Sequence, residues 1–513
     1  MKVLKFGGTS VGTAENLLNV KRIVEANTDS VIVVVSALGG LTDKLIETAR
    51  LAETGNVDFD NQMTAIKDRH QSIITQVISE GEKRDGLVVR VNELLAELHQ
   101  HYQDVFAIRE LSDKKLSAIV SYGERISSLI VAHLIEGAQW YDSLSFIKTE
   151  YRCHKHKLSG EATDRLIHAH FQSFCNCPKQ EAASLEDEHQ SAEAFYSSPK
   201  VALVPGFIST DVHTGELTNL GRGGSDYTAA ILAAALDAEC LEIWTDVDGF
   251  MTADPRLIPS AYPIKELSYN EAEELCNYGA KVVYPPTIYP VWYKNIPVLI
   301  KNTMNSETPG TYIRHIESNE AFEGTVGYSH ERMVPSVKGI SSVKDTSLIT
   351  ISGVGEGTQK DLWRDLSQSL SDECIQVLVA LQHPTTPKVL VGVKKEDTEY
   401  ACAALQKRLL SHGIQTLMCD GRRALETYEI HSAGYNKVCQ LDVTTDLSTI
   451  AMVGNVAHHS SGILDRLTSN LDKKSISVHT PCLEHAGLTF AYMVATSDLH
   501  TALEITHATA FQR

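Results

Sequence analysis

The segment at residues 5–10 has the residue types of a phosphate-binding loop. It reads Lys5-x-Gly7-Gly8-Thr9-Ser10 and lies between a short apolar stretch and a helical pattern. Glycines let backbone N–H groups approach phosphate oxygens, and the start of a helix adds a favourable dipole. Lys5 would supply a mobile positive charge for the phosphoryl group. The spacing is not that of a P-loop, and a plain tight turn explains this segment alone equally well.

A second glycine-rich segment, Gly221-Arg222-Gly223-Gly224-Ser225-Asp226, also precedes a helical pattern. The planar guanidinium of Arg222 is suited to holding a carboxylate through two hydrogen bonds. Asp226 could instead be a simple helix cap. A cap needs neither Arg222 nor the three glycines, so we favour a functional role for the segment.

Two further groups of polar residues suit nucleotide contacts. Thr245 and Asp246 follow an apolar strand pattern, a usual place for nucleotide or Mg²⁺ contacts in α/β sheets. Arg256 follows in Ala-Asp-Pro-Arg, and Lys281 lies in Gly-Ala-Lys-Val-Val. The alternatives are an Asx turn followed by a proline turn, and a solvated lysine.

Strands that alternate with helices must position these loops. The continuous β-branched run at 31–35 is typical of a central strand covered on both faces. Strand patterns at 201–204 and 240–244 enclose an alanine-rich helix at 227–236, which predicts an α/β sandwich. Beyond residue 330, two successive β-α-β-β patterns predict ferredoxin-like modules. We therefore expect domains at 1–313, 330–435 and 436–513.

Taken together, the motifs resemble the aspartokinase branch of the amino-acid kinase family. Four separated segments occur in that family's order, namely Lys-Phe-Gly-Gly-Thr-Ser, Gly-Arg-Gly-Gly-Ser-Asp-Tyr-Thr-Ala, Trp-Thr-Asp-Val-Asp-Gly and Gly-Ala-Lys-Val. Glu242–Gly249 and Ile300–Thr303 are most similar to the kinase half of bifunctional aspartokinase–homoserine dehydrogenases. The resemblance implies a three-layer αβα sandwich, the amino-acid kinase fold, followed by two ferredoxin-like α+β ACT-type domains. A dinucleotide-binding dehydrogenase half is not expected before Arg513.

The resemblance also implies a role for each site residue. The expected catalytic residues are Lys5, Arg222 and Asp226. Aspartate contacts are expected from Thr42, Glu124, Arg222 and Ser225, with Glu124 near the substrate amine. ATP contacts are expected from Lys5, Gly7, Gly8, Thr9, Ser10, Thr245, Asp246, Arg256 and Lys281. Mg²⁺ would arrive with the nucleotide, and no protein-bound metal is expected.

The implied reaction transfers the γ-phosphate of ATP to the β-carboxylate of L-aspartate, the first step of lysine, threonine and methionine biosynthesis. A carboxylate is already ionised at pH 7, so this nucleophile needs no general base. Two alternatives stay open: an acceptor such as glutamate or carbamate, and a catalytically quiet regulatory subunit. The ACT-like half could bind an effector, either threonine or lysine, or serve only to form a homodimer or higher homo-oligomer.

Composition and charge limit the partners. The chain has 513 residues and a net charge of −19, which disfavours nucleic acid. No apolar run is long enough for a membrane span, no targeting segment precedes the first glycine loop, and the ten cysteines lack a secreted pattern. These features predict a cytoplasmic protein. Cysteines and histidines gather at 151–200, but their spacing gives a metal site only about one chance in ten.

Overall fold

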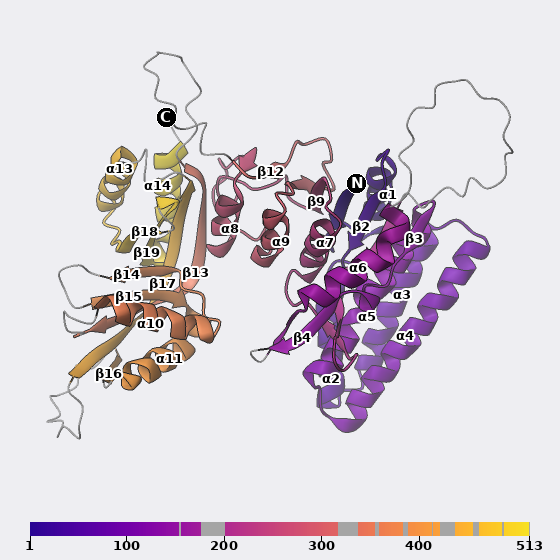
Figure 1. Cartoon of the computed structure of the whole chain (residues 1–513), viewed down its shortest axis with the longest axis horizontal. Coiled ribbons are helices and arrows are strands. Elements are labelled where there is room, and N and C mark those ends of the chain that lie inside the picture. Colours follow the sequence, from indigo (N-terminus) through magenta and orange to yellow (C-terminus); the bar gives the residue numbers. More distant parts are fainter. Residues whose placement is uncertain are drawn as a thin grey trace, which may run out of the picture. The chain divides into compact units, whose positions relative to one another are not determined.

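The computed structural model describes residues 1–152, 155–175, 201–316, 337–353, 359–382, 388–412, 414–420, 437–454, 461–484 and 487–511. The chain divides into two compact units (Figure 1). The first contains Met1–Phe250 and Val282–Ile316, and the second contains Met251–Lys281 and Glu317–Arg513. None of the described helices is long and apolar enough to cross a bilayer.

A mostly parallel sheet forms the centre of the first unit, with strand order β12-β11-β9-β1-β2-β6-β3. Its strands are β1 (Lys2–Phe6), β2 (Val31–Val35), β3 (Ala138–Trp140), β6 (Val201–Pro205), β9 (Cys240–Thr245), β11 (Val298–Asn302) and β12 (Thr311–Ile313). All five residues of β2 are buried, as the β-branched run predicts. β1 pairs in parallel with β2 and β9, so the loops that follow these strands leave the same edge of the sheet.

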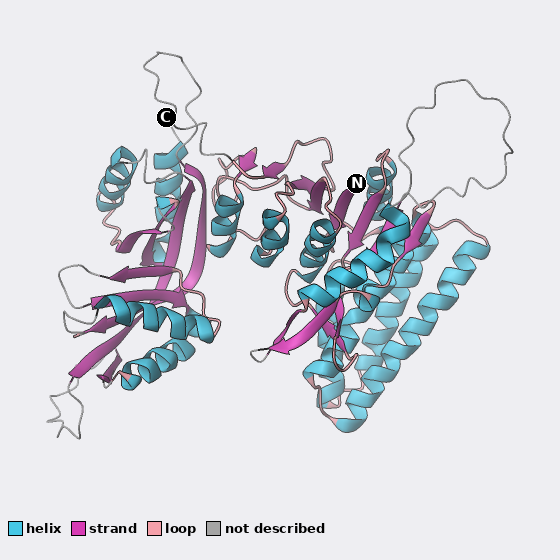
Figure 2. Cartoon of the chain, in the orientation of Figure 1, coloured by secondary structure: helices cyan, strands magenta, loops and turns pink. Residues whose placement is uncertain are grey.

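Helices cover this sheet on both faces (Figure 2). They are α1 (Ala14–Glu25), α2 (Leu41–Thr54), α3 (Phe59–Val77), α4 (Glu82–Ile108), α5 (Asp113–Leu134), α6 (Gly160–Cys175), α7 (Gly224–Ala235) and α9 (Ile288–Tyr293). α2, α3, α4 and α5 pack side by side and share one apolar core with β1 and β2. The motifs of the sequence had not indicated this helical group.

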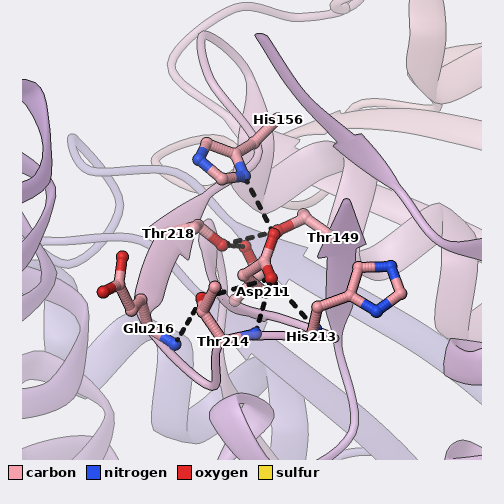
Figure 3. A network of polar contacts seen from close by, with 8 residues as sticks. Thr149, His156, Asp211, His213, Thr214, Glu216 and Thr218 are labelled. Atoms are coloured by element: carbon pink, nitrogen blue, oxygen red, sulfur yellow. Dashed lines mark hydrogen bonds and ion pairs between the residues drawn. The ribbon is translucent and has the colours of Figure 1, made fainter. Parts of the chain in front are cut away.

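The first unit also contains a small sheet with order β5-β4-β7-β8. Its strands are β4 (Lys148–Arg152), β5 (Lys155–Leu158), β7 (Ile208–Asp211) and β8 (Leu217–Asn219). Figure 3 shows the polar network that joins them. The Thr218 hydroxyl lies 2.7 Å from that of Thr149, and Asp211 Oδ2 lies 3.6 Å from His156 Nδ1. Backbone N–H groups of Thr214 and His213 also donate to Asp211 and hold the pKa of that carboxyl below its usual value.

This network accounts for part of the Cys- and His-rich segment noted in the sequence. His156 serves it as a partner of Asp211. Across the described residues, no group of three or more His, Cys, Asp or Glu side chains is arranged to hold a metal ion. Several members of the predicted cluster lie outside the described residues, namely Cys153, His154, Cys177 and His189.

The second unit is built on one seven-stranded sheet, with order β14-β15-β13-β17-β19-β18 and with β16 beside β17. Its strands are β13 (Val337–Ser352), β14 (Val379–Gln382), β15 (Lys388–Lys394), β16 (Ile414–Asp420), β17 (Lys437–Gly454), β18 (His479–Glu484) and β19 (Thr489–Ala495). Its helices are α8 (Tyr269–Asn277), α10 (Gln359–Asp372), α11 (Thr398–Ser411), α13 (Ser461–Asp472) and α14 (Leu499–Phe511), and the short strand β10 is Glu266–Leu267.

The predicted repeat is present in the order of these elements. β13-α10-β14-β15-α11 is followed, after β16, by β17-α13-β18-β19-α14, and β13 pairs antiparallel with β17. Each long strand contains an aspartate with positive φ, Asp345 at 54° and Asp446 at 61°. The pairing of β13 with β17 shifts register between Val343 and Thr346. The strand pattern in the sequence is clear only after each aspartate, at 347–352 and 448–453, because the irregularity interrupts it.

Candidate active site

The predicted phosphate loop leaves the carboxyl end of β1 in the middle of the sheet. Gly7 donates its N–H to the Trp244 carbonyl, 3.0 Å away, so the loop continues from the pairing of β1 with β9. Gly8 faces the loop that follows β2, where a Cβ would meet the Ala37 carbonyl at 3.1 Å. A side chain at this position would force the two backbones apart by a few tenths of an ångström, and glycine avoids this. α1 begins directly after the loop, capped by the Thr13 side chain.

Lys5 and Asp226 meet across the site. Lys5 Nζ lies 2.6 Å from Asp226 Oδ1, and the two side chains are only 10% and 13% exposed. Asp226 stands in the first turn of α7, which begins at Gly224 within the second glycine-rich segment. The fold thus brings together two motifs that are far apart in the sequence. The pair holds the lysine ammonium in place beside Gly7, where an added Cβ would lie 3.5 Å from Nζ.

The rest of the second glycine segment has two distinct environments. Arg222 is exposed and makes no ion pair with any residue that the structure describes. Its guanidinium is therefore available to bind a carboxylate. Ser225 is buried, and its Cβ would lie 2.6 Å from a Cβ at Gly206. Gly206 follows β6, so its lack of a side chain allows α7 to approach the end of that strand. Gly223 has φ 68°, which favours glycine.

Glu124 is the buried carboxyl of this region. It lies on α5, is 4% exposed, and its Oε2 has no hydrogen-bond partner among the described residues. Burial raises its pKa to about 8, against the smaller opposing effects of the Ala37 backbone N–H and of the Lys5 charge. Gly123 permits this position, because a Cβ there would meet the Ala37 Cβ at 2.7 Å. A buried carboxyl with an unpartnered oxygen is suited to binding an ammonium group.

The remaining predicted contacts in the first unit lie at the carboxyl end of β9 and in the loops that follow β1 and β2. Thr245 ends β9, and its hydroxyl donates to Asp246 Oδ1 at 3.2 Å. Asp246 is exposed. Thr42 is the second residue of α2, directly after the loop that follows β2. Thr9 is exposed, and its carbonyl accepts a hydrogen bond from the Asn16 side chain.

Ser10 has a structural environment that the sequence did not indicate. Its hydroxyl is fully buried, 2.7 Å from the Thr303 hydroxyl and 3.3 Å from the Trp244 carbonyl. The Thr303 N–H in turn donates to the Thr245 carbonyl. Ser10 therefore ties the phosphate loop to the ends of β9 and β11, and contact of its hydroxyl with a phosphate stays a prediction. Thr303 lies in a noted motif but had been given no role.

Arg256 and Lys281 lie in the second compact unit, unlike the other predicted site residues. Arg256 is exposed and binds Asp254, with its NH2 2.7 Å from Oδ2. This pairing lowers the pKa of Asp254 and raises that of Arg256. Lys281 is also exposed, and its charge is a small further cause of the lowered Asp254 pKa. ATP contacts from these two residues stay a prediction.

Comparison with known proteins identifies the family. The model of the amino acid kinase family matches residues 1–302. The chain belongs to the amino acid kinase family. A bifunctional aspartokinase/homoserine dehydrogenase of Haemophilus influenzae is 26% identical over 516 residues, covering 100% of this chain and 56% of that protein. Aspartokinase 1 of Arabidopsis thaliana is 25% identical, covering 99% of this chain and 80% of that protein. The chain spans about half the length of most of the bifunctional relatives that it matches.

Solved structures show the same fold over the whole chain. E. coli aspartokinase III in complex with aspartate and ADP superposes with a TM-score of 0.74 at 22% identity, covering 100% of both chains. The same enzyme in complex with lysine and aspartate gives a TM-score of 0.66. The predicted fold class, an amino-acid kinase sandwich followed by ACT-type modules, is confirmed. The domain boundaries at 313 and 435 stay predictions.

Proposed function

We propose that this member of the amino acid kinase family is an aspartate kinase, which transfers the γ-phosphate of ATP to the β-carboxylate of L-aspartate. The observation that carries the proposal is the Lys5–Asp226 pair of 2.6 Å at the junction of two glycine loops. The names of the relatives, aspartokinases that include an enzyme crystallised with aspartate and ADP, support this acceptor.

The proposed transfer requires positions and charges rather than a proton carrier. A β-carboxylate oxygen of aspartate forms a bond to the γ-phosphorus while the bond from phosphorus to the β–γ bridging oxygen breaks, and ADP leaves with that electron pair. Lys5 Nζ would neutralise charge that develops on the transferred group. Asp226 would hold this ammonium in position until the nucleotide binds.

The acceptor amino acid would be held at its other end. Glu124 offers a buried carboxyl oxygen without a protein partner for the α-ammonium group. Arg222, free of carboxylate partners among the described residues, would clamp a substrate carboxylate through its fork of donors. Thr42 and Ser225 are the further contacts that we propose for this end of the site.

Mg²⁺ enters the proposal with the nucleotide. The described residues include no group of three acidic or histidine ligands arranged for an ion, so the ATP phosphates are the ligands that we propose. Asp246, exposed at the end of β9, would be available to bind through water. The ion would add positive charge at the transferred phosphoryl group.

An ADP-release assay coupled to NADH oxidation tests the proposal. We expect release that depends on ATP, Mg²⁺ and L-aspartate together, with hydroxylamine trapping the acyl phosphate as a hydroxamate. Activity with L-glutamate or carbamate in place of aspartate would instead favour the second acceptor class. Absence of turnover with every acceptor, together with binding of amino acids, would favour a regulatory subunit.

The second unit is where we propose regulation or assembly. Its tandem modules have the fold of the matching region of E. coli aspartokinase III, which was crystallised with lysine. A thermal-shift series with lysine and threonine tests effector binding, because a ligand specific for the native state raises apparent stability. Light scattering tests the proposed homodimer or higher oligomer.

A further inference from the structure

Arg69 on α3 reaches two loops of the proposed active site. Its NH2 group donates to the Gly39 carbonyl at 2.8 Å and to the Gly12 carbonyl at 3.2 Å. Gly12 ends the phosphate loop after β1, and Gly39 lies in the loop after β2 that leads to Thr42. A single side chain therefore bridges the two loops to which the proposed function assigns the nucleotide and the amino acid.

These loops pack through bare backbone. A Cβ on Gly39 would lie 3.0 Å from the Gly8 carbonyl oxygen, and one on Gly12 would lie 3.2 Å from the same atom. No side chain separates the two loops at this contact. Their spacing therefore depends on the backbone itself and on the groups that hold it from outside, and Arg69 is a charged group that does so.

The base of Arg69 is fixed by burial of its own helix. Ile66, His70 and Ile73 are buried on α3, and His70 Nδ1 lies 2.7 Å from the Ile66 carbonyl. Burial lowers the pKa of His70 to about 4, so His70 is neutral near pH 7 and is not a second cation beside Arg69. The guanidinium thus extends from a helix that is anchored in the core by its buried residues.

Arg69 has no carboxylate partner among the residues that the structure describes. Its hydrogen bonds to the two carbonyls leave its positive charge uncompensated next to the phosphate loop. A hydrogen bond from a charged donor is stronger than a neutral one, so two such bonds from one nitrogen give a firm link.

We propose that Arg69 is a positioning residue that couples the nucleotide loop to the aspartate loop, so that binding of each substrate favours binding of the other. The inference rests on the proposed function. Because Arg69 acts through Gly12 and Gly39, its loss should change the coupling between the substrates more than the affinity for either one alone. Coupling between two ligands is reciprocal, so it can be measured from both sides.

The test compares Arg69→Ala and Arg69→Met with Arg90→Ala as matched control. Arg90 is an exposed arginine on α4 that pairs with Glu93. The dissociation constant of a non-hydrolysable ATP analogue is measured with and without L-aspartate, and kcat and both KM values are measured separately. For Arg69→Ala we expect the coupling factor to fall close to one and kcat/KM to fall on the order of 10²-fold, as for a displaced reacting group. Added guanidinium should restore part of the lost rate.

Each outcome decides a separate question. Wild-type protein without aspartate-dependent ADP release would refute the proposed function, whatever the variants do. Active wild type with unchanged coupling in Arg69→Ala would overturn the inference alone. If Arg69→Ala does not fold, Arg69→Met decides, because methionine keeps an unbranched stem but can donate to neither carbonyl. Full coupling in folded Arg69→Met would overturn the positioning role, and reduced coupling with an unchanged melting temperature would support it.

Discussion

The protonation of Glu124 should control the binding of aspartate. Burial raises the pKa of this carboxyl to about 8 in the free protein. At pH 7 Glu124 is therefore ionised in about one molecule in eleven. Each further decrease of one pH unit reduces this ionised fraction about tenfold. An α-ammonium group binds the carboxylate and not the neutral acid. We expect the apparent KM for L-aspartate to fall about ninefold from pH 6 to 7 and about fivefold from pH 7 to 8, and to level off above pH 8.

The groups around Glu124 determine the size of this effect. Desolvation is the largest cause of the raised pKa, while Lys5 from β1 and the Ala37 N–H from the loop after β2 lower it. Asp226 pairs with Lys5 and so screens part of that lysine charge. When the substrate ammonium arrives, it favours the ionised form and the proton leaves. Near pH 7, close to one proton should be released for each aspartate bound.

Two measurements check this linkage. Initial rates at saturating MgATP give KM for aspartate from pH 6 to 9, and calorimetry in buffers of different ionisation enthalpy gives the protons released. Glu124→Gln is the control, since titration of the substrate or of other groups persists in it. We expect this variant to bind weakly at every pH, with no proton release. A flat KM in the wild type between pH 6 and 8, or the same slope in Glu124→Gln, would refute the reasoning.

Three other substitutions test the site and its support. Lys5→Ala should lower kcat by several orders of magnitude with an unchanged circular dichroism spectrum, and near-normal turnover would contradict the phosphoryl-transfer role. Gly39→Val should raise KM for both substrates together, because its Cβ would lie 3.0 Å from the Gly8 carbonyl; a change in only one KM would count against the packed loops. His70 has a pKa lowered to about 4 in the folded state, so the unfolded chain binds more protons between pH 4 and 6.5. Stability should therefore fall with acid in that window, by up to about 3 kcal/mol, and denaturant midpoints should show less of this loss in His70→Gln.

The parts of the fold that sequence predicted are those encoded locally. The buried β-branched run of β2, the glycine loop after β1 and the helix that begins at Gly224 each have a signal within a few residues. Their meeting at one edge follows from parallel pairing, which places the carboxyl ends of strands together. The Lys5–Asp226 pair is thus a consequence of local motifs and of the sheet.

The parts that sequence missed depend on contacts between distant segments. Nothing near Arg69 in the sequence indicates that its side chain reaches Gly12 and Gly39, because a helix pattern gives the face of a residue and not its partner. The contact of Ser10 with Thr303 is of the same kind. At Asp345 and Asp446 the cause is local instead. The irregular backbone at each aspartate interrupts the strand pattern, so the sequence does not show that β13 and β17 are continuous.

The site reconciles an acidic chain with anionic substrates partly by neutralising two of its own charged groups, Lys5 and Glu124, until the substrates bind. The net charge is −19, yet the proposed reaction brings ATP and aspartate together. Lys5 is paired with Asp226, and Glu124 is largely protonated near pH 7. On substrate binding, phosphate oxygens would replace part of the contact of Asp226 with Lys5, and the substrate ammonium would replace the proton of Glu124. Each substrate would then meet a charge that the empty site had neutralised, which limits the cost of burying charge in either state.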